Sequence, residues 1–155
     1  MASRVFLSST FTDLSEYRKT VQTAIRQLGA VDVSMEHFGA RDERPAEECV
    51  RLVHQESDLF VGIYAHRYGY VPDGADVSIS EMEYKAASDA ALPRFIYVVD
   101  ENQPWLPSHV DDGTKRARLI EEGPKGQRNR AGRPAACLRQ KRHIDLFLTF
   151  TERLR

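Results

Sequence analysis

Glu83 is the residue whose type and position in this chain best fit chemistry. It falls in residues 78–93, a segment with the spacing of an amphipathic helix. At about 100° per residue, Glu83 lies within the apolar stripe of that helix. The other members of the stripe are Ile79, Met82, Ala86, Ala87 and Ala90. A carboxylate directed at a protein core is either paired or functional, so Glu83 is the candidate catalytic residue.

The nearby Glu81 has a structural explanation. Ser78 and Glu81 have the spacing of a capping box, in which the serine oxygen accepts from the third helical amide and the glutamate returns to the serine amide. The helical periodicity also places Glu81 on the polar side of the helix, with Lys85, Ser88 and Asp89. Glu83 is therefore the carboxylate without a capping role.

The elements that must position Glu83 alternate between strands and helices. The predicted strands are 4–9, 31–38, 59–64 and 94–99, and the predicted helices are 14–28, 45–53 and 78–93. Asp13 is the expected cap of the first helix, and Pro45 suits the first turn of the second. This alternation predicts a three-layer α/β domain with a parallel sheet of four to five strands, covered on both faces.

In a sheet of this kind, ligands bind beyond the carboxyl ends of the strands. The candidate ligand-binding residues at that edge are Ser8, Ser9, Thr10, Tyr64, Arg67 and Tyr68. Together with Glu83 they suit a sugar nucleotide, because small hydroxyls admit phosphate near a helix N-terminus, and a glutamate can accept from ribose or stabilise an oxocarbenium-like centre. Tyr64, Tyr68 or Tyr70 could stack on a base, and Arg67 could pair with phosphate or with Glu83.

Each of these assignments has a structural alternative. The three hydroxyl residues at 8–10 could cap the first helix, and the tyrosines could pack a loop. An ion pair between Arg67 and Glu83 could serve the fold alone. The sequence leaves these alternatives open.

Several standard sites are missing from the sequence. It contains no Gly-x-Gly-x-x-Gly after the first strand, no Gly-Lys-Ser/Thr phosphate loop and no Gly-x-Ser-x-Gly elbow. His54 and His66 lack the spacing of a helical ligand pair. We therefore expect no metal site and no bound cofactor.

Length and composition favour a cytoplasmic protein with no membrane association. The 155 residues suffice for one domain with a real core. No apolar run approaches the roughly 20 residues of a membrane span, and the N-terminus lacks the apolar region of a signal peptide. Cys49 lies on an apolar face of a predicted helix, so we expect it to be a reduced cysteine in the core.

The charge is distributed unevenly, which divides the chain into a domain at 1–110 and a basic extension at 111–155. Residues 1–114 carry 10 basic and 19 acidic side chains, whereas residues 115–155 carry 12 and 4. Nucleic acid is not the expected partner, because no aromatic residue is interleaved with the basic ones between 115 and 142. Residues 123–134 are rich in Gly, Pro, Arg and Asn, so we expect them to be mobile. Predicted helices at 111–122 and 135–142 flank them. A strand at 143–150 is a candidate to complete the sheet.

Several motifs, in order, resemble the family called domain of unknown function 4062. They are Val5–Leu14, Arg18, Met35–Phe38, Ser57–Asp58, Tyr68–Gly69 and Ser78–Ala87, and the resemblance extends over residues 4–100. The family is similar in layout to Toll/interleukin-1 receptor domains and nucleoside 2-deoxyribosyltransferases, which have a flavodoxin-like sheet. It typically forms the N-terminal module of larger proteins, so the resemblance implies further domains as partners.

The resemblance also implies a role for Glu83. Enzymatic Toll/interleukin-1 receptor domains cleave NAD with a glutamate on the helix before the fourth strand, and Glu83 occupies a similar place. Deoxyribosyltransferases carry a nucleophilic glutamate in a similar helix, where Glu81 and Glu83 compete and the helical face favours Glu83. Activity in such domains implies self-association.

Three functions therefore stay open. The first is a nucleotide-recognising signalling domain that hydrolyses the N-glycosidic bond of NAD, its substrate, which makes the chain a candidate NAD glycohydrolase. The second is a non-catalytic module for protein interaction and oligomerisation, and the third is nucleoside deoxyribosyl transfer.

Overall fold

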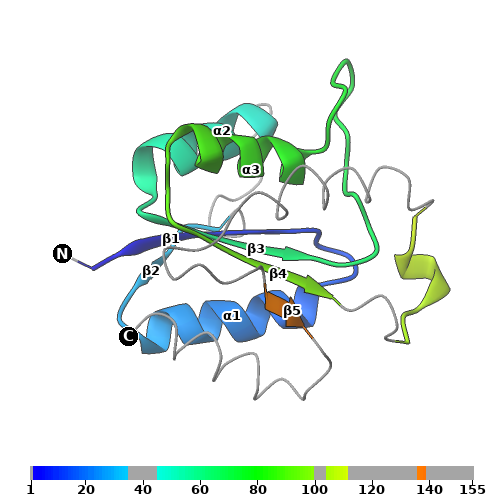
Figure 1. The fold of residues 1–155 in the computed structure, drawn as a ribbon, viewed down its shortest axis with the longest axis horizontal. Coiled ribbons are helices and arrows are strands. Elements are labelled where there is room, and N and C mark those ends of the chain that lie inside the picture. Colours follow the sequence, from blue (N-terminus) through cyan, green and yellow to red (C-terminus); the bar gives the residue numbers. More distant parts are fainter. Residues whose placement is uncertain (1, 35–44, 100–103, 112–135, 139–155) are drawn as a thin grey trace.

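The computed structural model describes residues 2–34, 45–99, 104–111 and 136–138. Within these residues, strands and helices alternate along the chain (Figure 1). They are β1 (Arg4–Ser9), α1 (Ser15–Gln27), β2 (Val31–Asp32), α2 (Pro45–Glu56), β3 (Leu59–Tyr64), α3 (Ile79–Asp89), β4 (Arg94–Val99), the 3-10 turn η2 (Pro107–His109) and β5 (Ala136–Leu138).

The five strands form one parallel sheet in the order β2-β1-β3-β4-β5. Helix α1 covers one face of the sheet, and α2 and α3 lie side by side over the other (Figure 1). This strand order is the flavodoxin-like one. The predicted three-layer α/β domain with a parallel sheet of four to five strands is confirmed.

Alternate residues of each strand supply the two faces of the core, because successive side chains of a strand point to opposite sides. Val5 and Leu7 of β1 pack toward α1. Phe6 of β1 packs toward α2 and α3, where its ring stacks on that of Phe60 with centroids 6.0 Å apart. Ser8 shares the face of Phe6, so its hydroxyl points toward the two-helix layer.

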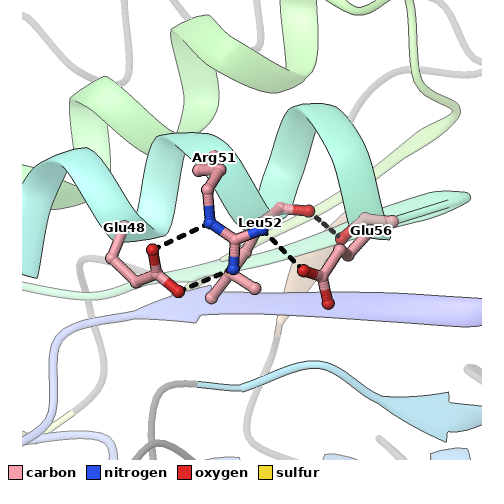
Figure 2. A network of polar contacts seen from close by, with 5 residues as sticks. Glu48, Arg51, Leu52 and Glu56 are labelled. Atoms are coloured by element: carbon pink, nitrogen blue, oxygen red, sulfur yellow. Dashed lines mark hydrogen bonds and ion pairs between the residues drawn. The ribbon is translucent and has the colours of Figure 1, made fainter.

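Helix α2 carries a network of charged side chains (Figure 2). Arg51 donates two hydrogen bonds to Glu48, of 2.8 and 2.7 Å, and a third of 2.7 Å to Glu56. These side chains are partly exposed, so the network contributes modestly to stability. Its bonds raise the pKa of Arg51, which keeps the guanidinium charged.

Two predictions at the N-terminal half of the fold need correction. Asp13 is not the cap of α1: the N-cap position is Leu14, which makes no side-chain capping bond, and Asp13 instead accepts from Thr10. The strand expected at 31–38 spans only Val31–Asp32 within the described residues, and residues 35–38 lie outside them.

The helix expected at 135–142 is also wrong, because its described part is strand β5. Ala136, Cys137 and Leu138 pair in parallel with Tyr97, Val98 and Val99 of β4. The open edge of β4 offers backbone donors and acceptors that this apolar segment satisfies as a strand, which overrides its local helical pattern. The helix expected at 111–122, the mobile segment at 123–134 and the strand expected at 143–150 lie outside the described residues, apart from Asp111.

Across the described part of the chain, no helix is both long and apolar enough to span a bilayer.

Candidate functional site

Glu83 and Ser8 meet at the carboxyl edge of the sheet. The Ser8 hydroxyl, at the end of β1, donates a 2.5 Å hydrogen bond to Oε2 of Glu83 on α3. Both side chains are buried, with exposed fractions of 1% and 4%. The inward position of Glu83 agrees with the helical periodicity. A buried carboxylate needs donors, and a neutral hydroxyl supplies one of them here.

Gly62 makes room for this pair. It is the β3 partner of Ser8 in the parallel register, so the two residues are neighbours on the same face. A β-carbon at Gly62 would come within 3.0 Å of the Tyr64 hydroxyl and 2.9 Å of Ile96 Cδ1. Glycine is thus the residue that lets the Tyr64 hydroxyl occupy the space beside the pair.

Tyr64 and Cys49 also lie near Glu83. Burial raises the pKa of Tyr64, and the negative charge of Glu83 adds to the shift. Burial likewise raises the pKa of the Cys49 thiol on α2, and Glu83 adds to it by charge and as a hydrogen-bond acceptor. Both groups therefore stay protonated and face the carboxylate as neutral hydroxyl and thiol.

The second glutamate of α3 is buried as well, which corrects the prediction that it lies on the polar side. Glu81 is only 2% exposed. It accepts a 2.5 Å hydrogen bond from the Tyr68 hydroxyl and forms a 2.8 Å salt bridge with Lys85. The serine half of the predicted capping box is confirmed, since Ser78 accepts from the Glu81 amide at 3.3 Å, whereas the Ser78 amide donates to the Tyr68 hydroxyl at 3.2 Å. Glu81 thus has structural partners, as its capping position suggests.

Ser9 and Thr10 turn away from Glu83 toward the start of α1. Ser9 Oγ accepts from the guanidinium of Arg18 at 2.8 Å, and Arg18 is itself buried on α1. Thr10 donates a 2.5 Å hydrogen bond to Asp13. None of the three hydroxyls at 8–10 makes a side-chain capping bond at the start of α1. Ser8 alone of this group is bonded to the carboxylate.

Arg67 does not reach Glu83. Its guanidinium donates to the carbonyl of Ser108 at 3.5 Å, so the alternative of a structural Arg67–Glu83 ion pair is wrong. The loop around Arg67 is held by the segment after β4, because Asp111 accepts from the Tyr68 amide at 2.6 Å. His66 packs on Trp105 with ring centroids 5.4 Å apart.

The structure thus places the predicted residues in two groups. Ser8 and Tyr64 lie beside Glu83, whereas Ser9, Thr10, Arg67 and Tyr68 bind other partners at the same edge of the sheet. Cys49 is the neighbour of Glu83 that the sequence assigned only to the core. The one available signal was its place on the inner face of α2, which fixes the layer but not the contact.

The donor set does not suit a metal ion. In the part of the chain that the structure describes, no three His, Cys, Asp or Glu side chains gather into a potential metal site. The neighbours of Glu83 include the hydroxyls of Ser8 and Tyr64 and the thiol of Cys49. What this arrangement can do is accept hydrogen bonds from a polyhydroxyl ligand or stabilise a nearby positive charge.

Comparison with known proteins identifies the family. A search of curated proteins found no match to this sequence. The family model described as Domain of unknown function (DUF4062) matches residues 4–146. The match includes the motifs noted above and continues beyond residue 100, through β5. The chain therefore belongs to the DUF4062 family.

Proposed function

We propose that this chain is a nucleotide-recognising domain that hydrolyses the N-glycosidic bond of NAD at Glu83. The observation that carries the proposal is the buried Glu83 carboxylate, bonded to Ser8 at 2.5 Å at the carboxyl edge of a parallel sheet. This is the edge at which open α/β sheets bind ligands. The resemblance to Toll/interleukin-1 receptor domains points to the same residue.

The reaction would break the bond between C1′ of the ribose and the pyridinium nitrogen of nicotinamide. The bonding electron pair passes to that nitrogen, which becomes neutral, and C1′ takes on oxocarbenium character. The negative charge of Glu83 stabilises this cation, and its oxygens accept from the ribose hydroxyls. Water then adds its oxygen to C1′ and releases a proton, so the products are nicotinamide and ADP-ribose.

In this proposal the neighbours of Glu83 position the carboxylate. Ser8 fixes one oxygen, and Cys49 and Tyr64 stay protonated, so neither of these two groups adds a negative charge beside the carboxylate. Signalling, self-association and attachment to further domains belong to the proposal through the resemblance, and a cytoplasmic location belongs to it through the composition of the sequence.

Nicotinamide release from NAD tests the proposal. The chain is incubated with NAD at high protein concentration, because self-association is expected, and Glu83→Gln is compared with two variants of the same helix. Glu81→Gln alters a buried carboxylate with structural partners, and Asp89→Asn alters an exposed one. We expect release that Glu83→Gln reduces at least a hundredfold and Asp89→Asn leaves unchanged. Glu81→Gln should act only through stability.

Two other results would overturn the proposal that the chain hydrolyses NAD. Absence of release, with concentration-dependent assembly that Glu83→Gln leaves intact, indicates the non-catalytic interaction module. Base exchange on a deoxynucleoside, with no release from NAD, indicates deoxyribosyl transfer.

A further inference from the structure

Exposed apolar side chains gather on the loops that follow the strands. Within the described residues, the large hydrophobic side chains that remain exposed are Phe11, Val31, Tyr70, Leu106 and Val110. All except Val31 follow the carboxyl end of β1, β3 or β4. The apolar surface is thus concentrated at the edge that carries Ser8 and Glu83, and two of its members are aromatic.

Phe11 and Tyr70 belong to neighbouring loops. Thr10 and Gly69, the residues just before them, are in close approach: a β-carbon on Gly69 would lie 3.2 Å from Thr10 Cγ2. Gly69 has a φ of +99°, which favours glycine and lets the β3–α3 loop pass this close to the β1–α1 loop. Figure 1 shows both loops leaving the same edge of the sheet.

Tyr70 is also tied to the helix that carries Glu83. Its carbonyl accepts from the amide of Ile79, the first residue of α3, at 3.0 Å. Glu83 follows four residues later, about 6 Å along the helix axis at 1.5 Å per residue. The backbone of Tyr70 is therefore fixed at the start of α3, about one helical turn along the axis from Glu83.

The other tyrosines at this edge cannot serve as a stacking surface. Tyr64 and Tyr68 are buried, and the Tyr68 hydroxyl is bonded to Glu81. Phe11 and Tyr70 are each 67% exposed, so their ring faces are open to solvent. Exposed flat rings on the loops that lie at the same edge of the sheet as a buried polar pair suit a ligand with a flat base at one end and a sugar at the other.

We propose that Phe11 and Tyr70 form the stacking platform for the base of the nucleotide whose ribose meets Ser8 and Glu83. This inference deepens the proposed function and rests on it for the identity of the ligand. Aromatic side chains stack on nucleobases of every kind, and a pyridinium base gains a further cation–π attraction. The base lies at the exposed rim and the ribose at the buried carboxylate.

Calorimetric titration with three probes tests the platform. Nicotinamide mononucleotide has a pyridinium base, AMP has a purine, and ribose 5-phosphate has no base. We expect Phe11→Ala and Tyr70→Ala each to weaken the binding of at least one nucleotide about tenfold, with ribose 5-phosphate unaffected. Comparison of the two nucleotides identifies the base. Tyr70→Phe keeps the ring and should bind as the parent chain does.

Leu106→Ala is the matched control, because Leu106 is an aliphatic residue at the same edge of the sheet with an exposed fraction of 62%. This substitution should leave nucleotide binding unchanged. The inference is overturned if both alanine variants bind the nucleotides with the affinity of the parent chain. It is also overturned if the two substitutions weaken the binding of ribose 5-phosphate as much as that of the nucleotides. It is also overturned if no nucleotide binds, or if the variants change only sedimentation, as a surface for a second copy would.

The test of the stacking platform can fail or succeed independently of the test of NAD hydrolysis. Nucleotide binding that depends on the two rings, without nicotinamide release from NAD, retains the platform and rejects the hydrolase. Nicotinamide release that requires Glu83, with a KM unchanged in the two alanine variants, retains the hydrolase and rejects the platform.

Discussion

Tyr68 donates a 2.5 Å hydrogen bond to the buried carboxylate of Glu81. The same hydroxyl accepts from the Ser78 amide at 3.2 Å, so it joins the two partners of the helix cap. The β3–α3 loop is thereby fastened to the first turn of α3. Because Asp111 holds the Tyr68 amide, one residue connects the loop, the helix of Glu83 and the segment after β4.

Removal of the Tyr68 hydroxyl should therefore destabilise the fold. Tyr68→Phe leaves the Glu81 carboxylate and the Ser78 amide each short of a partner, which we expect to lower the free energy of unfolding by about 1–3 kcal/mol. Urea unfolding followed by the fluorescence of Trp105, the single tryptophan, measures the change. Tyr70→Phe is the control, because Tyr70 is exposed, and an equal loss in both variants would contradict the assigned role.

Ser8→Ala should affect stability and the proposed activity together. The variant leaves Glu83 Oε2 without its Ser8 donor in a buried place, a loss of about 1–3 kcal/mol. A less firmly held carboxylate should also lower kcat for nicotinamide release. Steady-state kinetics and urea unfolding measure the two effects, with Ser88→Ala, an exposed serine on α3, as the control. Full activity in Ser8→Ala would show that the bond does not position Glu83.

The sequence predicts the sheet and the inward position of Glu83 because both depend on local periodicity. Alternation of strand and helix indicates a parallel sheet, and helical spacing places Glu83 on the apolar stripe. The Ser8–Glu83 bond joins residues 75 positions apart, and the topology predicts their shared edge but not their contact. That contact requires Ser8 to share the face of Phe6 and Gly62 to leave space.

The predictions that proved wrong concern residues whose structure depends on partners far away in the sequence. Glu81 is buried because Tyr68, on the preceding loop, supplies a donor for it, and no helical wheel includes that loop. Residues 136–138 form a strand because β4 presents an open edge. The exposure of Phe11 and Tyr70 follows from the path of two loops, for which sequence periodicity carries no signal.

The tyrosines predict how stability depends on pH at the alkaline end. Burial raises the pKa of Tyr17, Tyr64, Tyr68 and Tyr84 in the folded chain. In the unfolded chain they ionise near about 10, so above that pH the folded state holds more protons. Their contribution is complete below about pH 10 and is lost as the pH rises further.

The urea concentration at the midpoint of unfolding should therefore decrease as the pH is raised from 9 to 11. Absorbance at 295 nm reports the cause, because these four tyrosines should ionise at a higher pH in the folded chain than in the unfolded chain. In urea all six tyrosines of the chain should titrate together. Ionisation of Tyr17, Tyr64, Tyr68 and Tyr84 near pH 10 in the folded state would contradict the raised pKa of these four side chains.

Gly62→Ala tests the space beside Ser8 and Glu83. The added β-carbon would lie 2.9 Å from Ile96 Cδ1 and 3.0 Å from the Tyr64 hydroxyl, and the strand backbone cannot easily yield because β3 pairs with a strand on each side. We expect overpacking to lower the free energy of unfolding by about 1–3 kcal/mol. Displacement of the Tyr64 ring should also weaken nicotinamide release.

Ile96→Val provides the matched test of the cause, since it removes the Cδ1 atom that meets the new β-carbon. Alone it should cost about 0.5–1.5 kcal/mol. Combined with Gly62→Ala it should relieve part of the crowding, so the loss in the double variant should be smaller than the sum of the two single losses. Strictly additive losses in urea unfolding would mean that the destabilisation comes from the Tyr64 contact or the backbone rather than from Ile96.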